Sequence, residues 1–201
     1  MINQKIIRML DIISRELNER QVPYSLIGAL ALGSYGFPRF TADVDILTEN
    51  TYSDIISELM ENLGYTCFQK TKLFAQFDSE KGDLGKVDFM FVSTDEGKNI
   101  IKRSAFIVDE LIGSNPVVQP VDYIGLKLMA IANNPTRSVK DIVDIFQCLQ
   151  VVKNGLLPTT FELPDRERIY YYADHFGLRE RVDDIFRKLN EKANAPEGFE
   201  L

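Results

Sequence analysis

The sequence predicts an α/β (α+β) fold in which a small mixed β-sheet with flanking helices precedes a helical C-terminal part. Candidate strands lie in the first half of the chain, and the clearest is Lys86–Val92, a run rich in β-branched and aromatic residues. In the second half, apolar residues recur every three or four positions, as they do along helices. We therefore expect an α/β domain over residues 1–108 and a helical region over residues 109–201 that packs on it.

Composition excludes several classes of protein. The chain has 201 residues, of which 45% are hydrophobic and 26% charged, so it is neither a disordered protein nor a disulfide scaffold. The formal net charge of -7 disfavours binding of nucleic acid by bulk charge. The longest uncharged stretch, Gln21–Pro38, is shorter than a bilayer span and is broken by glycine and proline. We expect a cytoplasmic protein with no membrane segment, whose oligomeric state the sequence leaves open.

The first half of the chain divides into short elements. From Ile6 to Leu17 apolar residues recur with the spacing of one helix face, which predicts an amphipathic helix. Ser53 and Gly64 are suited to cap a later helix at its start and its end. The remaining elements are predicted as a strand at Val22–Ile27, a helix at Ala29–Tyr35, a strand at Val44–Thr48, the capped helix at Ser53–Leu63, strands at Tyr65–Phe68 and Leu73–Phe77, a turn at Asp78–Gly85 and the strand at Lys86–Val92.

Beyond Val92 the pattern is helical. Two helices are joined by a loop that contains Pro135, and two more are separated at Gly177. Their predicted bounds are Pro120–Ala132, Ser138–Val152, Leu163–Phe176 and Leu178–Lys192, followed by a loose tail at Ala193–Leu201.

Three carboxylates are the first candidates for chemistry. Because side chains alternate along a strand, Asp43 and Asp45 point to the same side, where an apolar residue would otherwise be expected. Asp88 stands inside a strongly apolar strand, where a charge is costly unless it is paired or bound to a metal. A polar strand end and an ordinary salt bridge are the structural alternatives. The functional hypothesis is that the three carboxylates together bind one or two divalent cations, since hard cations take oxygen ligands.

A glycine at the end of the first strand adds a second signal. Gly28 closes the strand and opens the next helix, so that backbone N–H groups and the helix dipole are offered to an anion. A tight turn without a ligand is the alternative. An anion cradle beside a pair of carboxylates is the combination that a metal-bound triphosphate requires.

In this order, the motifs resemble those of a known group. Strand, glycine, helix, D-x-D and a later isolated strand carboxylate resemble the nucleotidyltransferase superfamily with the DNA polymerase β-like fold. More narrowly, Arg39–Asp45 fits the R-x-T-x-D-x-D of AbiEii-toxin-type minimal nucleotidyltransferases, and Asp122–Ala130 and Arg137–Asp144 are similar to later segments of that group. The resemblance covers about Val22–Leu149, and the last fifty residues match nothing comparable.

The resemblance implies an enzyme that transfers a nucleoside monophosphate from a nucleoside triphosphate, such as ATP, to a hydroxyl and releases pyrophosphate. The reaction would depend on Mg²⁺ or Mn²⁺. Asp43, Asp45 and Asp88 would be both metal ligands and catalytic residues. Lys127 and Lys140 are further candidates for binding the nucleotide. The structural alternative for Lys127 is a surface lysine whose ammonium group reaches the solvent. For Lys140 it is an i,i+4 ion pair that only stabilises its helix. The residues that would bind the nucleotide are Gly28, Ala29, Ser34, Arg39, Thr41, Lys127 and Lys140.

One departure from the family keeps an alternative open. The phosphate turn of the group usually reads Gly-Gly or Gly-Ser, whereas this chain has Gly28–Ala29, which lacks the hydroxyl and the second glycine's freedom. The alternative is a non-catalytic relative that binds nucleotide or a partner protein, such as an antitoxin within a toxin–antitoxin pair. The acceptor also stays open between tRNA, a protein side chain and a small molecule, and the nucleobase preference is hidden.

Overall fold

A computed structural model describes residues 4–79, 85–109 and 112–191. The chain forms two compact units. The first comprises residues 1–119 together with Pro158–Phe161, and the second comprises residues 120–157 and 162–201. The prediction of a mixed α/β domain followed by helices is confirmed, although the first unit extends to Gln119 rather than to residue 108.

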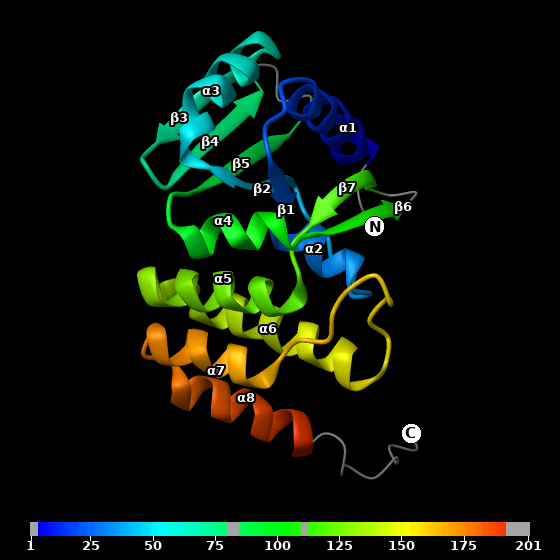
Figure 1. Ribbon diagram of the computed structural model, residues 1–201, viewed down its shortest axis with the longest axis vertical. Coiled ribbons are helices and arrows are strands. Elements are labelled where there is room, and N and C mark those ends of the chain that lie inside the picture. Colours follow the sequence, from blue (N-terminus) through cyan, green and yellow to red (C-terminus); the bar gives the residue numbers. More distant parts are fainter. Residues whose placement is uncertain (1–3, 80–84, 110–111, 192–201) are drawn as a thin grey trace, which may run out of the picture. The chain divides into compact units, whose positions relative to one another are not determined.

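A seven-stranded mixed sheet forms the centre of the first unit, with the strand order β3-β4-β5-β2-β1-β7-β6 (Figure 1). β2 runs parallel to β5 and antiparallel to β1, while β1 and β7 are parallel. In β5, Val87, Phe89 and Phe91 are buried and the residues between them are more exposed, so the sheet has one closed and one more open face. The bounds are β1 Tyr24–Leu26, β2 Asp43–Glu49, β3 Tyr65–Lys70, β4 Phe74–Ser79, β5 Lys86–Val92, β6 Ala105–Asp109 and β7 Gly113–Val117.

The last two strands were not predicted. β6 and β7 pair antiparallel at one edge of the sheet, and β7 also pairs with β1. β7 contains Pro116 and begins at Gly113, two residue types that are depleted in strands, so its local pattern does not indicate one. Its position at the sheet is therefore decided by long-range pairing. These two strands carry the first unit past the predicted boundary.

Among the described residues of the first unit, four α-helices accompany the sheet. The N-terminal helix is as expected, and Ile6, Leu10, Ile13 and Leu17 are all buried along one of its faces. The predicted cap at Ser53 is wrong, because Ser53 is the first helical residue and Tyr52 holds the cap position without a side-chain hydrogen bond. The bounds are α1 Gln4–Glu19, α2 Gly28–Ser34, α3 Ser53–Asn62 and α4 Asp95–Lys102, with a short 3₁₀ turn at Asn50–Tyr52.

Up to Glu191, the second unit is built from helices and their connections. α5 contacts α6 and α7, and α8 contacts α6 and α7. α7 begins at Arg166 rather than at Leu163, because the Asp165 side chain accepts the Glu167 N–H and thereby caps the helix. No helix in the described ranges is long and apolar enough to cross a membrane. The bounds are α5 Pro120–Asn133, α6 Ser138–Lys153, α7 Arg166–His175 and α8 Arg179–Glu191, with a 3₁₀ turn at Pro135–Arg137, while the predicted tail lies outside the described residues.

A short segment between α6 and α7 belongs to the first unit. Phe161, which is 6% exposed, places its ring edge-to-face with Tyr35 at a centroid distance of 4.8 Å. Tyr35 is itself fully buried, and its hydroxyl donates a hydrogen bond to the Val118 carbonyl oxygen at 2.6 Å. Residues 158–161, which we call the strap, thus complete the core of the first unit at the end of α2.

Removing the Phe161 ring should destabilise the first unit. We expect Phe161→Ala to lower the free energy of unfolding by about 3 kcal/mol, because the truncation leaves a cavity against Tyr35. Leu163→Ala is the control, since that side chain is 74% exposed and its loss should change the free energy by less than about 0.5 kcal/mol. Urea unfolding of both variants measures the difference, and equal small effects would refute a structural role for the strap.

Candidate active site

The three predicted carboxylates come together on the first unit. β2 and β5 are parallel neighbours in which Asp45 lies directly opposite Asp88, and Asp43 lies opposite Lys86. One oxygen from each of Asp43, Asp45 and Asp88 lies within 4.8 Å of the others. All three residues are half-buried, on the more open face of the sheet. The alternation of β2 and its register with β5 therefore build the cluster.

The electrostatics of this cluster call for a cation. Two unit negative charges about 4 Å apart repel by roughly 4 kcal/mol at an effective dielectric constant of 20, before screening by water. The donor set consists of carboxylate oxygens, which suit a hard divalent ion such as Mg²⁺ or Mn²⁺. The residues present therefore fit the metal that the sequence predicts.

The glycine turn lies directly against this cluster. Gly28 has φ +63°, and a Cβ built on it would lie 1.9 Å from Asp45 Oδ2. The backbone N–H of the preceding residue, Ile27, donates to the Asp45 carbonyl oxygen at 3.0 Å. Only glycine satisfies both the backbone conformation and the close approach of the carboxylate. Gly28 is thus required at this position by Asp45 itself.

We expect Gly28→Ala to reduce any metal-dependent activity about 100-fold, because the new methyl group displaces the Asp45 carboxylate by an ångström or more. Gly64→Ala is the matched control: Gly64 has φ +80° but no atom within 4 Å of a built Cβ, so it carries the strain without the collision. Metal affinity and turnover of the two variants provide the measurement. If both variants behave alike, backbone strain alone explains the effect.

The other predicted nucleotide-binding residues of the first unit lie at different places. Thr41 is buried, and its hydroxyl donates to the Asp43 carboxylate, so it orients a predicted metal ligand. Ala29 is buried in the first turn of α2. Ser34 is at the opposite end of this seven-residue helix, where its hydroxyl donates to the Leu30 carbonyl oxygen at 3.0 Å. Arg39 is half-buried in the loop before β2, and its Nη1 lies 3.4 Å from the Phe40 carbonyl oxygen.

The two predicted lysines belong to the second unit. Lys127 on α5 lies between two carboxylates of α6, with Nζ 2.8 Å from Asp141 Oδ1 and 2.7 Å from Asp144 Oδ2. These side chains are 11%, 0% and 5% exposed, respectively. Asp144, the i,i+4 partner predicted for Lys140, therefore pairs with Lys127 instead, and Lys140 itself is exposed. This geometry favours a structural role for Lys127 in joining α5 to α6.

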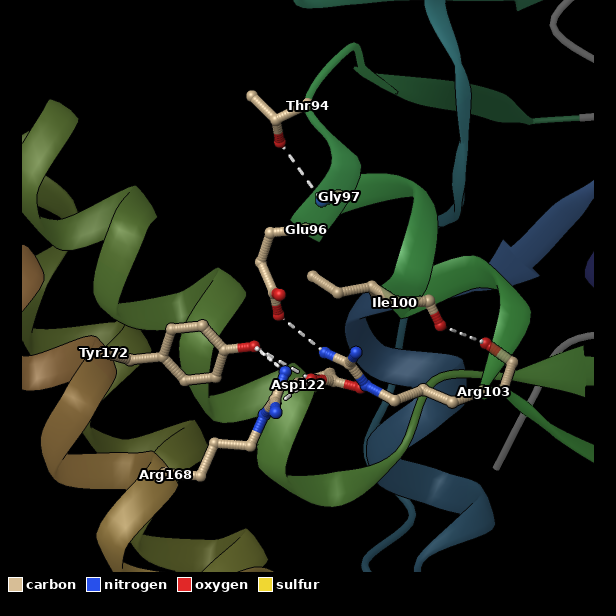
Figure 2. Close-up of polar contacts among 9 residues, drawn as sticks. Thr94, Glu96, Gly97, Ile100, Arg103, Asp122, Arg168 and Tyr172 are labelled. Atoms are coloured by element: carbon tan, nitrogen blue, oxygen red, sulfur yellow. Dashed lines mark hydrogen bonds and ion pairs between the residues drawn. The ribbon is translucent and has the colours of Figure 1, made fainter.

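A second polar cluster joins α5 to α7 within the same unit. Figure 2 shows Tyr172 and Arg168 converging on Asp122, which is fully buried. The Tyr172 hydroxyl donates to Asp122 Oδ1 at 3.0 Å, and Arg168 Nε lies 3.8 Å from the same oxygen. Gly125 allows the approach, because a Cβ there would lie 2.7 Å from the Tyr172 ring. Tyr172 thus contributes to the packing of α7 on α5.

One residue of the site was missed by sequence reasoning. Gln76 on β4 lies opposite Asp88 in the β4–β5 register, and its Nε2 donates to Asp88 Oδ2 at 2.8 Å. The available signal was weak: Gln76 is the middle polar position of an alternating strand, flanked by the buried Ala75 and Phe77. Only the pairing of β4 with β5 gives it a partner.

Solved structures provide the comparison with known proteins. No protein-family model matches the sequence, and no curated protein matches it either. The lincosamide antibiotic adenylyltransferase LnuA is 14% identical, with a TM-score of 0.52 over 72% of this chain and 96% of that one. The antibiotic-resistance factor ANT(2'')-Ia is 13% identical, with a TM-score of 0.59 over 93% of this chain and 96% of that one. A nucleotidyltransferase-like protein from Paracoccidioides brasiliensis is 10% identical, with a TM-score of 0.56 over 94% and 93%.

This chain has the nucleotidyltransferase fold. The fold that the broad resemblance implies is the one these structural neighbours have, while the narrower resemblance to AbiEii-type proteins stays a prediction. The matches cover 93% or more of each neighbour's own chain, but 72% of this chain for LnuA and 93% and 94% of it for the other two.

Proposed function

We propose that this protein is a metal-dependent nucleotidyltransferase that transfers a nucleoside monophosphate from a nucleoside triphosphate to a hydroxyl group. The observation that carries the proposal is the cluster of Asp43, Asp45 and Asp88 on a sheet of the nucleotidyltransferase fold. In the proposed reaction the acceptor oxygen attacks the α-phosphorus, the bond to the bridging oxygen breaks, and pyrophosphate leaves with the electron pair of that bond.

The chain's own residues divide the task. Asp43, Asp45 and Asp88 would hold one or two Mg²⁺ ions, which when bound neutralise the triphosphate and stabilise the entering and leaving oxygens. Thr41 orients Asp43, and Gly28 leaves the space that Asp45 occupies. Asp88 is the candidate to receive the proton of the acceptor hydroxyl. The turn at Gly28 and Ala29, together with Arg39, would position the phosphates.

The acceptor is proposed to be a small molecule in preference to tRNA or a protein. LnuA is described bound to lincomycin, and ANT(2'')-Ia is described in complex with adenylyl-2''-tobramycin, so small acceptors occur on this fold. Two of the α7 and α8 side chains that could attract RNA are neutralised by neighbours, since Arg179 pairs with Asp174 and Arg187 pairs with Asp184. Those pairs and the net charge of -7 weaken an electrostatic RNA groove.

The test is a calorimetric titration of ATP, CTP, GTP and UTP into the protein, with Mg²⁺ and with a chelator. Binding of one nucleotide that depends on Mg²⁺ supports the proposal and identifies the donor for an acceptor screen with pyrophosphate release as the readout. Nucleotide binding that does not depend on the metal favours the alternative of a non-catalytic relative. The observation that favours this alternative is Ala29, which is buried and replaces the second glycine of the family's phosphate turn. Absence of all nucleotide binding would contradict both the proposed transferase and a nucleotide-binding relative, and would leave only a relative that binds a partner protein.

A further inference from the structure

We propose that Gln76 is a positioning residue of the metal site, which fixes the orientation of the Asp88 carboxylate beside Asp43 and Asp45. The inference rests on the proposed function, because it concerns how the same three carboxylates are held. It adds a supporting residue from a third strand, β4, to a site whose three carboxylates lie on β2 and β5.

Strand register places Gln76 in one row with two of the carboxylates. Gln76 lies opposite Asp88 across β4 and β5, and Asp88 lies opposite Asp45 across β5 and β2. Side chains directly opposite one another on one face of a sheet are close enough to interact. The hydrogen bond from Gln76 Nε2 to Asp88 Oδ2, at 2.8 Å, is therefore a direct result of the sheet topology.

The chemistry of the amide suits this task. An amide N–H donates to a carboxylate without adding a charge, so it orients Asp88 without competing with a cation for the cluster. Gln76 is half-buried, which limits exchange of this bond with water. One Asp88 oxygen is held by Gln76, and an oxygen of Asp88 lies within 4.8 Å of its counterparts on Asp43 and Asp45. Partners that orient a metal ligand in this way typically change metal affinity about 10- to 100-fold when removed.

Thr41 performs the equivalent task for a second ligand. Its hydroxyl donates to Asp43, and Gly28 allows Asp45 its close approach to the backbone. Each of the three carboxylates thus has a different neighbour that determines its position. Asp43 accepts a hydroxyl, Asp45 fits into the space beside a glycine, and Asp88 accepts an amide N–H. Gln76 is the only one of these neighbours that the sequence motif does not contain, since it precedes Asp88 by twelve positions on another strand.

The experiment measures Mn²⁺ affinity by electron paramagnetic resonance in the wild-type protein and in Gln76→Leu, a change that keeps the size of the side chain and removes the donor. Gln76→Met is a second variant of the same length. Gln69→Leu is the matched control, because Gln69 lies opposite Gln76 on β3 and is exposed. Thermal unfolding of every variant in chelator, without metal, shows whether the fold is retained.

We expect the Mn²⁺ dissociation constant to rise by about tenfold or more in both Gln76 variants, with Gln69→Leu equal to the wild type and all metal-free melting temperatures alike. A rise of less than fivefold in both Gln76 variants overturns the inference while leaving the proposed function intact. Failure of the wild-type protein to bind Mn²⁺ overturns the metal site itself, and the inference falls with it.

Discussion

Replacing Asp43 and Asp45 together by asparagine should abolish metal-dependent nucleotidyl transfer, with a loss of at least about 10³-fold. The change removes two of the three carboxylates that fit a divalent ion, and the several kcal/mol that such an ion contributes to transition-state stabilisation disappear with it. Nucleotide binding should lose its dependence on Mg²⁺ at the same time. Pyrophosphate release and calorimetry, with and without the metal, provide the two measurements.

The same variant carries its own control for folding. Because two repelling charges are removed, we expect its melting temperature in chelator to equal or exceed that of the wild-type protein by a few degrees. Addition of Mg²⁺ should raise the melting temperature of the wild-type protein and leave the variant unchanged. Transfer activity that survives in the variant would contradict the proposed role of both aspartates.

Lys127→Met should destabilise the second unit by about 3–5 kcal/mol. The change leaves Asp141 and Asp144 buried without the ammonium group that lies between them, and an uncompensated buried charge is costly. Urea unfolding measures the effect. Lys140→Met is the matched control on the neighbouring helix: that side chain is exposed, so its replacement should cost less than about 0.5 kcal/mol.

A combined variant separates stability from nucleotide binding. Replacing Asp141 and Asp144 by asparagine in the Lys127→Met background removes the uncompensated charges, and we expect most of the lost stability to return. If nucleotide affinity returns with it, Lys127 acts through the fold. If stability returns and affinity does not, Lys127 contacts the phosphates as the sequence predicts, and the structural interpretation is insufficient.

The residues of the candidate site that could be predicted are those marked by a pattern within their own strand. The D-x-D pair is visible because strand alternation places Asp43 and Asp45 on one side, and Asp88 is visible because it interrupts an apolar strand. Their convergence depends on β2 and β5 being parallel neighbours, which no local pattern specifies. Gln76 has only the weak signal of a polar position in an alternating strand, and it was missed because its partner follows from the pairing of β4 with β5.

The fold shows the same limit. Long helices and the strand Lys86–Val92 were predicted to within a few residues, because periodicity and composition act over many positions. β6 and β7 were missed because each has five residues, and a proline and a glycine in β7 oppose the assignment. The partners of Lys127 were also hidden, since the sequence does not say which face of α6 meets α5.

The strap also determines how this protein can be divided. A cut after Gln119 would separate the two units in sequence, yet the piece it releases would lack Phe161, the ring that closes the core beside Tyr35. The shortest continuous stretch that holds a complete first unit therefore runs through all of α5 and α6. The helical second unit therefore cannot be replaced by that of a relative unless the replacement also carries an aromatic residue that packs on Tyr35.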